Sequence, residues 1–308
     1  MQGTSIRPPS NPGGDRFVRV HFIDSSAYRD ARQLLALSNP VHCHHAEPTI
    51  SWAAGEQLNV LDIDLDLFVS NPVFRLEDSG RADDSRTEPW TEPALRAFLE
   101  NQCHLSTERP MPGRVGCHHD EAYDFWAQLI RSDQLTAPFD VVHADAHSDL
   151  GWGPAGWTHL LVDHLACSVE DRHPPVRGDR HLHYGNYLAY AVANRWISAI
   201  TWVYHEKQRA ESFDILFRNF DSASGFLELP YCREAALSTW IGNRGRPKTN
   251  GAIGCEKREP PVPFRMVPSS DYNARRQFDF IFVAKSPGYT PPQSDKLIPI
   301  LEEYIEAI

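Results

Sequence analysis

The chain has 308 residues, of which 41% are hydrophobic and 23% are charged, so it suits one large α/β domain or two ordinary ones. Its formal net charge of −11 disfavours nucleic acid as a partner and favours a cationic one. No apolar run reaches roughly 18 residues, so the sequence gives no indication of a membrane span.

The N-terminal part of the chain differs in composition from the rest. Residues 1–15 are rich in Pro, Gly and Ser, and we expect a disordered lead-in followed by a single domain over 16–308. This segment lacks the apolar core of a signal peptide. The 6 cysteines include no CxxC pair, so neither a zinc ribbon nor a disulfide framework is indicated. We therefore expect a cytoplasmic protein.

Strand and helix patterns alternate along the chain. Period-2 alternation or continuous apolar runs predict strands over 17–24, 58–68, 197–204 and 277–287, and a strand with its exit loop over 139–150. Helical spacing predicts helices over 94–101, 120–130, 186–196 and 294–308, the last one capped by Ser294. We interpret 81–93 as a polar loop and 207–276 as irregular excursions around the sheet.

This alternation predicts the fold class. Strands that alternate with helices favour a three-layer α/β/α domain with a mostly parallel sheet. Ligands of such sheets bind beyond the carboxyl ends of the strands.

Two acid-rich motifs follow apolar strands. "LDIDLDLF" places Asp62, Asp64 and Asp66 on one face, and "VVHADAHSDL" delivers Asp145, His147 and Asp149 at alternate positions. Buried carboxylates are costly unless a cation compensates them. An oxygen-rich set with a few imidazoles suits Mn²⁺, and two ions that share bridging carboxylates can activate a water molecule.

Each motif also has a simpler interpretation. The Asp triplet could be a solvated strand edge, although Val60 and Phe68 beside it argue against exposure. Tandem histidines such as His118 and His119 are more often loop residues than ligands. The same holds for the histidines of "HCHH" over 42–45, which we interpret as loop residues.

Together, these motifs resemble those of the arginase (ureohydrolase) superfamily, whose metal motifs are a GGDH-type turn, DAHxD and SxDxDxxDP. The resemblance covers "VLDIDLDLFVSNPVF", "CHHDEAYDFW", "VVHADAHSDLGWG", "GNYLAYAVANRWISAITWVY" and "FIFVAKSPGYTPPQSD". Within the superfamily the chain looks like the peptide arginases. Those enzymes convert arginine residues of a ribosomally made peptide to ornithine and release urea.

The resemblance implies a role for each motif residue. His119 and Asp149 would bind the first Mn²⁺, His147 and Asp66 the second, and Asp145 and Asp64 would bridge the two ions. Asp62 would support a ligand from behind or replace one, since a slip of two residues would select Asp62 and Asp64 instead. His118 is the alternative to His119.

The sequence departs from the superfamily pattern in three places. The DxD strand precedes DAHSD, so the domain would be arginase-like with a permuted strand. The "xxDP" tail is absent. Ser286 stands where free-arginine enzymes carry the glutamate that grips the guanidinium, so that role would fall to Glu121, Glu206 or Asp163.

The implied reaction is hydrolysis of a peptide arginine by a metal-activated water. His159 and His183 are the candidates for the histidine that protonates the leaving amine. The partner would be an arginine-containing precursor peptide, drawn to a groove between 69–113 and 207–276. Two alternatives remain: another amidine or amide hydrolase, agmatinase-like or deacetylase-like, and a peptide-binding module without turnover.

Overall fold

A computed structural model describes residues 57–74, 81, 87–151, 157–172, 181–208, 214–242 and 255–308. The predicted lead-in over 1–15, the predicted strand over 17–24 and the histidines of 42–45 lie outside these residues. No helix within the described ranges is long and apolar enough to cross a membrane.

The domain is built on one mixed sheet of 8 strands, confirming the predicted fold class. In spatial order the strands are β10 (Ile305–Ala307), β2 (Met111–Gly116), β9 (Phe280–Ala284), β1 (Asn59–Asp64), β3 (Phe139–Asp145), β4 (Ile197–Tyr204), β8 (Val262–Pro268) and β5 (Phe226–Leu227). Every pairing is parallel except that of β5 with β8. A small hairpin-like pair joins β6 (Pro230–Cys232) and β7 (Cys255–Arg258).

Helices cover both faces of this sheet. Within the described residues the α-helices are α1 (Glu92–Ala97), α2 (Glu121–Arg131), α4 (Tyr187–Ala193), α5 (Glu234–Gly242) and α6 (Ile298–Glu302). Two π-helical segments are η4 (Phe98–Gln102) and η5 (His159–Asp163). The 3-10 turns are η3 (Leu65–Phe68), η6 (His164–Ala166), η7 (Val169–Asp171), η8 (Asp214–Leu216), η9 (Arg218–Phe220), η10 (Ser222–Ser224), η11 (Ser269–Asp271) and η12 (Pro292–Leu297).

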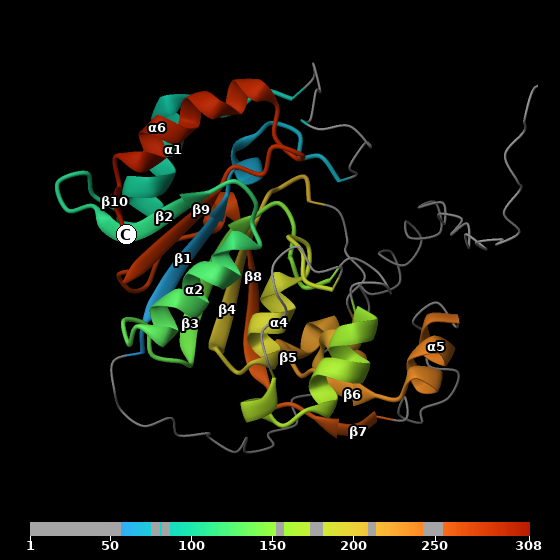
Figure 1. The fold of residues 1–308 in the computed structure, drawn as a ribbon. Helices are drawn as coiled ribbons and strands as arrows, with labels where there is room; N and C mark the ends of the chain where they lie inside the picture. The colour runs from blue at the N-terminus through green and yellow to red at the C-terminus, as the bar shows by residue number, and fades with distance from the viewer. Residues whose placement is uncertain are drawn as a thin grey trace, which may run out of the picture. The chain divides into compact units, whose positions relative to one another are not determined.

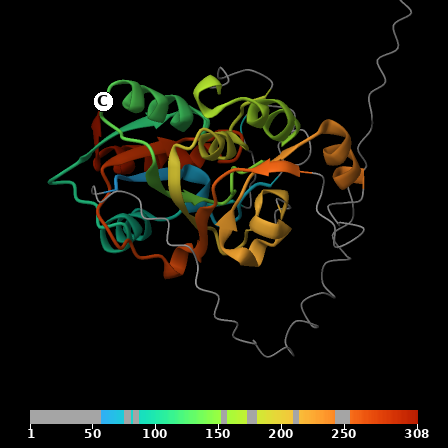
Figure 2. The ribbon, with the colours of Figure 1, turned by 90° about the horizontal axis from the view of Figure 1, so that it is seen from below.

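The core is divided by the sheet into two apolar clusters. One cluster joins α2 and α4 to the face of β1 and β3 that carries Val60 and Val141. The other joins α1, η4 and α6 to the opposite face, which carries Leu61 and Val142. Figures 1 and 2 show α2 on one side of the sheet and α1 on the other. The sheet is therefore the middle of three layers, and successive residues of each strand point into different clusters.

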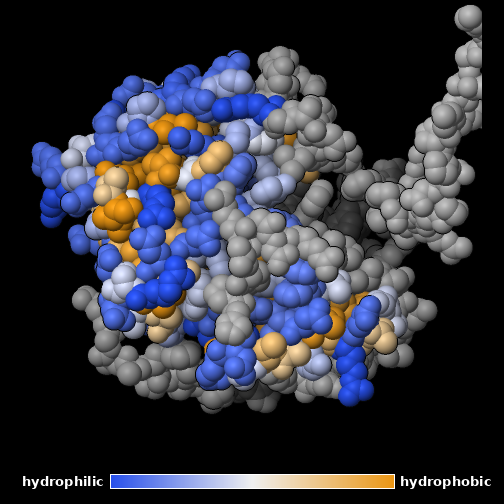
Figure 3. Space-filling view, in the orientation of Figure 1, coloured by the Kyte–Doolittle hydropathy of each residue, from blue (hydrophilic) through white to orange (hydrophobic). Residues whose placement is uncertain are grey.

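The face of the molecule seen in Figure 3 carries both polar and apolar residues. Figure 3 shows hydrophilic residues over much of one face, with apolar residues gathered in the region of α1, α6 and β2.

The predicted elements need four corrections. The strand predicted over 58–68 ends at Asp64, where the chain turns into η3. β2 was missed because Pro112, Gly113 and Gly116 weaken its strand pattern. The segment 207–276 is not only irregular, since it contributes β5 and β8 to the main sheet. The last helix is split into η12, α6 and a closing strand, β10.

Ser294 does not cap the last helix. It lies inside η12, which follows Pro291 and has no side-chain cap.

Candidate metal centre

The polar cluster lies where β1 and β3 end, on the sheet face that α2 and α4 cover. These neighbouring strands are parallel, and Asp62 of β1 stands opposite His143 of β3. Asp64 and Asp145 follow two residues later on the same face. The adjacency of two acid-bearing strands therefore arises from the sheet order, although the strands are far apart in the sequence.

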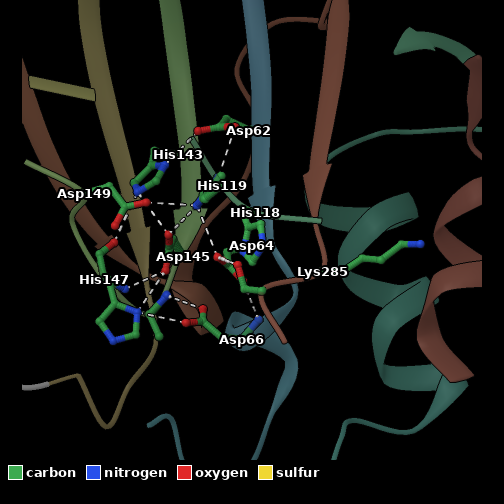
Figure 4. Close-up of polar contacts among 12 residues, drawn as sticks. Asp62, Asp64, Asp66, His118, His119, His143, Asp145, His147, Asp149 and Lys285 are labelled. Carbon is green, nitrogen blue, oxygen red and sulfur yellow. Dashed lines mark hydrogen bonds and ion pairs between the residues drawn. The ribbon is translucent and has the colours of Figure 1, made fainter. Parts of the chain in front are cut away.

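His119 completes one group of side chains. It comes from the turn between β2 and α2 and is 1% exposed. Its Nδ1 lies 3.2 Å from Oδ2 of Asp64, 2.9 Å from Oδ2 of Asp145 and 3.0 Å from Oδ2 of Asp149. Three carboxylate oxygens thus surround one imidazole nitrogen (Figure 4).

A second group forms at the exit of the strands. Nδ1 of His147 lies 2.8 Å from Oδ2 of Asp66 and 3.5 Å from Oδ1 of Asp145. Figure 4 shows these side chains near the strand ends, whereas Asp62 lies farther along the strands, away from His147 and Asp66. Asp145 therefore belongs to both groups, and presents a different oxygen to the histidine of each.

Backbone hydrogen bonds orient several carboxylates of the cluster. In three of them a backbone N–H fixes one oxygen: Oδ1 of Asp64 accepts from Asp66, Oδ1 of Asp66 from Ala146, and Oδ1 of Asp145 from His147. The opposite oxygens of Asp66 and Asp145 are buried and have no hydrogen-bond partner among the residues that the structure describes. Such oxygens are costly unless something positive meets them.

The two histidines are oriented in the same way. Nε2 of His147 lies 3.0 Å from the carbonyl oxygen of Val73, and Nε2 of His119 lies 3.2 Å from Oδ1 of Asp62. A proton on Nε2 therefore faces an acceptor in both rings, and the Nδ1 lone pair is directed among carboxylates. Metal-binding histidines show this arrangement, because an acceptor on the far nitrogen fixes the tautomer.

These contacts are the ones expected of a site that binds cations. Four candidate ligand groups overlap here, and in each group the ligand atoms lie within 4.8 Å of one another. Two of them are Asp64, His119 and Asp145, then Asp66, Asp145 and His147; the other two include His143, with Asp62 and His119 or with Asp145 and Asp149. Even a doubly protonated imidazole has only one proton on Nδ1, whereas more than one carboxylate oxygen faces that nitrogen, so hydrogen bonds alone leave acceptors unmatched. Divalent cations would satisfy them.

The pKa values express the same surplus of negative charge. Burial and the charge of Asp145 raise the pKa of Asp149 to about 7, and burial with the charges of Asp145 and Asp64 raises that of Asp66. Burial alone would lower the pKa of His119, yet the carboxylates, Asp62 foremost, raise it well above its usual value. Protons are thus drawn to positions that a cation would take, and metal binding would release them.

Asp62 supports the centre from behind. One of its oxygens faces Nε2 of His119, and the other lies 2.9 Å from Nδ1 of His143 and accepts from Oη of Tyr187 at 2.5 Å. Burial would raise the pKa of Asp62, but the two histidines lower it to about 2. The residue therefore stays ionised and holds both rings.

Sequence reasoning missed His143 and Tyr187. His143 precedes Asp145 by two positions on a strand, so period-2 alternation already places both on one face. Tyr187 comes from α4, within an apolar run, and nothing in its local sequence marks it as a polar contact.

Two residues of the centre adopt left-handed backbone conformations. Asp149 has φ of 48° and Ser286 has φ of 43°, which are unusual for residues other than glycine. Ser286 begins the loop after β9, and its hydroxyl donates to Oδ2 of Asp64. Strain of this kind persists where surrounding contacts fix it, and it often occurs at functional sites.

Other predicted site residues lie apart from the two groups. His118 is exposed, and within the described residues its ring makes no hydrogen bond or ion pair to the cluster. His159 faces Oη of Tyr190 at 2.8 Å and stacks on His181. Nδ1 of His183 accepts from the backbone of Gly185.

The three acids proposed for the guanidinium make other contacts. Oε1 of Glu121 accepts from the backbone N–H groups of Cys117 and His118, and Oε1 of Glu206 accepts from the hydroxyl of Ser269 and the N–H of Ser270. Asp163 is exposed at the end of η5.

No family model, no curated protein and no solved structure matches the chain. The resemblance to the arginase superfamily therefore rests on the sequence motifs.

Proposed function

We propose that the protein is a Mn²⁺-dependent hydrolase with two ions per chain, and that it converts arginine residues of a ribosomally synthesised peptide to ornithine with release of urea. The observation that carries the proposal is the position of Asp145. Its two carboxylate oxygens serve two separate ligand groups, as a bridge between neighbouring ions requires.

The choice of metal follows from the donor atoms. Carboxylate oxygens outnumber the imidazole nitrogens in both groups, and such sets favour Mn²⁺ over zinc. Bound ions would lower the pKa of a coordinated water molecule and stabilise negative charge next to it.

The residues of the chain would position these parts. His119, Asp64 and Asp149 would hold one ion, His147 and Asp66 the other, and Asp62 would orient His119 through its far nitrogen. Asp64 as a second bridge remains a prediction, since its described contacts are to the His119 group. The proton that the leaving amine needs is assigned to no residue, because the described contacts of His159 and His183 are to Tyr190, His181 and Gly185.

The substrate class rests on the resemblance and on charge. A guanidinium is cationic, and the net charge of −11 attracts a basic peptide rather than nucleic acid. Cleavage of its C–N bond by water yields urea and a primary amine.

The first experiment is the metal content of the purified protein after Mn²⁺ loading, compared with an Asp145→Asn variant. We expect two ions in the wild type and their loss in the variant, because the amide retains the shape but not the charge. Asp133→Asn is the matched control: Asp133 is exposed, and its φ of 57° is one that asparagine tolerates. Arginine-containing peptides are then tested for urea release.

Other results point elsewhere. One tightly held zinc ion would favour deacetylase-like chemistry. No metal after loading would contradict the proposal and favour a peptide-binding module. Two ions without urea from arginine peptides would leave the metal centre standing and exclude the arginase reaction.

A further inference from the structure

Access to the metal centre passes His147. Its side chain is 20% exposed, whereas the side chains of its partners Asp66 and Asp145 are 0% and 1% exposed. In the other group, His119 and Asp149 are 1% and 8% exposed. Within the described residues, a substrate therefore reaches the centre beside the His147 ring.

Aromatic rings surround this entrance. The ring centroids of Phe74 and Tyr289 lie 5.2 Å and 4.8 Å from that of His147. Tyr184 meets Tyr289 edge-on at 5.6 Å, and all three aromatic side chains are half-buried. We refer to Phe74, Tyr184 and Tyr289 as the aromatic mouth.

Tyr289 is held in place by its loop. Its backbone N–H donates to the carbonyl of Ser286 at 2.8 Å, and the hydroxyl of the buried Thr290 donates to the carbonyls of Lys285 and Ser286. Ser286 in turn donates to Asp64, so the same short loop contacts the metal centre through Ser286 and carries Tyr289 of the aromatic mouth. The ring is thus preorganised relative to the ions that the centre would bind.

A cation can be recognised here without a further acid. The faces of aromatic rings carry negative quadrupole charge, and a guanidinium stacks on them. The acids that could grip the guanidinium are engaged elsewhere or exposed, as described above. Neutral rings also avoid adding another carboxylate that would compete for the ions.

We propose that the aromatic mouth is the receptor for the guanidinium side chain, and that Tyr289 is a residue that determines specificity for a cationic substrate. The inference rests on the proposed function, since it names the group that this site recognises. Tyr289 binds through its ring face, and its hydroxyl is not required.

The test measures direct binding to the Mn²⁺-loaded protein. The probes are N-acetyl-argininamide and N-acetyl-citrullinamide, which have nearly the same shape but differ in charge. Stopped-flow quenching of intrinsic fluorescence records binding before turnover. The variants are Tyr289→Leu, which removes the ring, and Tyr289→Phe, which keeps it. Tyr231→Leu, at a half-buried tyrosine of β6, is the control.

We expect Tyr289→Leu to raise the dissociation constant of the arginine probe about tenfold, as loss of a partly desolvated cation–π contact predicts. Tyr289→Phe and Tyr231→Leu should stay near the wild-type value, and the citrulline probe should bind weakly to all. The metal content of Tyr289→Leu should equal that of the wild type.

Three results would overturn the inference. If Tyr289→Leu and the wild type bind the arginine probe with equal affinity, the aromatic mouth does not bind the guanidinium, whereas the proposed function still stands. Equal loss of both probes shows packing rather than charge recognition. Loss of metal in Tyr289→Leu shows that the ring only supports His147. Failure of the proposed function is separate, since it appears in the wild type as missing ions or missing urea.

Discussion

At the scale of single residues, Asp62 decides how firmly one imidazole is held. It binds no ion in our proposal, yet it faces the far nitrogen of His119, and it also contacts His143 and Tyr187. Carboxylates in this position fix the tautomer and raise the basicity of the ligating histidine. The strength of the metal site therefore depends on a side chain behind it.

We predict that Asp62→Asn weakens the binding of one ion about 10- to 100-fold and leaves the other nearly unchanged. The reason is that Asp62 contacts His119 but has no described contact with His147. Stepwise Mn²⁺ titration followed by paramagnetic resonance measures the two affinities. Tyr187→Phe, which removes one donor to Asp62, should give a smaller effect in the same direction. Equal weakening of both ions would contradict this assignment.

At the scale of elements, helix α2 positions the turn that carries His119. Asp120 precedes the helix without a side-chain cap, and Glu121 reaches back to the N–H groups of Cys117 and His118 instead. Its negative charge also lies at the helix N-terminus, where it is favourable. Glu121 therefore has a structural task at the place where the sequence suggested a guanidinium ligand.

We predict that Glu121→Ala lowers the free energy of unfolding by about 1 kcal/mol, as expected for loss of the hydrogen bonds to the preceding turn. Glu121→Gln should lose less, because its amide oxygen still accepts from the two N–H groups. Denaturant unfolding measures both. The two variants also separate the two roles of Glu121. If Glu121 binds the guanidinium, Glu121→Gln should lose arginine binding; if it only stabilises the turn before α2, arginine binding should persist.

The short turn η6 is joined to α4 through a neutral histidine. Nε2 of His164 lies 2.8 Å from Oδ1 of Asn194, and His164 is 6% exposed. Burial lowers its pKa to about 4; the charge of Arg172 and of His159 acts in the same direction, whereas Asn194 and Glu259 act against it. The unfolded chain takes up a proton near pH 6.5, and the folded chain does so only near pH 4.

We predict that this histidine makes stability fall as the pH is lowered from about 6.5 to 4, by about 3 kcal/mol in total. The sign follows because the unfolded state binds more protons in this window, so its contribution is complete above pH 6.5 and lost below pH 4. Replacement by glutamine should flatten the dependence in this window. His118→Gln, at an exposed histidine, should leave it unchanged. Parallel curves for the wild type and His164→Gln would contradict the prediction.

At the scale of the whole molecule, the sequence predicts the three layers and the meeting of Asp64 with Asp145, because strand ends of a parallel sheet share one edge. It does not predict Tyr187, whose contact with Asp62 depends on where α4 crosses the sheet. Strand β2 is missed for a different reason, since its glycines and proline weaken the local strand pattern and its pairing with β9 and β10 is visible only in the sheet. The sequence does not predict contacts that depend on tertiary packing rather than on the local pattern of residues.

The cluster of buried carboxylates also links metal binding to the stability of the domain. Its five carboxylates are each at most 7% exposed: Asp62, Asp64, Asp66, Asp145 and Asp149. When the chain folds without cations, only nearby imidazoles and bound protons compensate much of their negative charge. A ligand that binds only the folded state stabilises it according to its concentration relative to the dissociation constant.

We therefore predict that Mn²⁺ at 100 times its dissociation constant adds about 2.7 kcal/mol per site to the free energy of unfolding, and that a chelator reverses the gain. The gain should shrink below pH 7, because Asp149, with a pKa of about 7, must lose its proton before it binds an ion. Thermal unfolding with and without Mn²⁺ measures both effects. Asp145→Asn should show no gain, since the shared carboxylate is gone, whereas Asp133→Asn should behave as the wild type. A gain of equal size in Asp145→Asn would place the stabilising ions elsewhere in the protein.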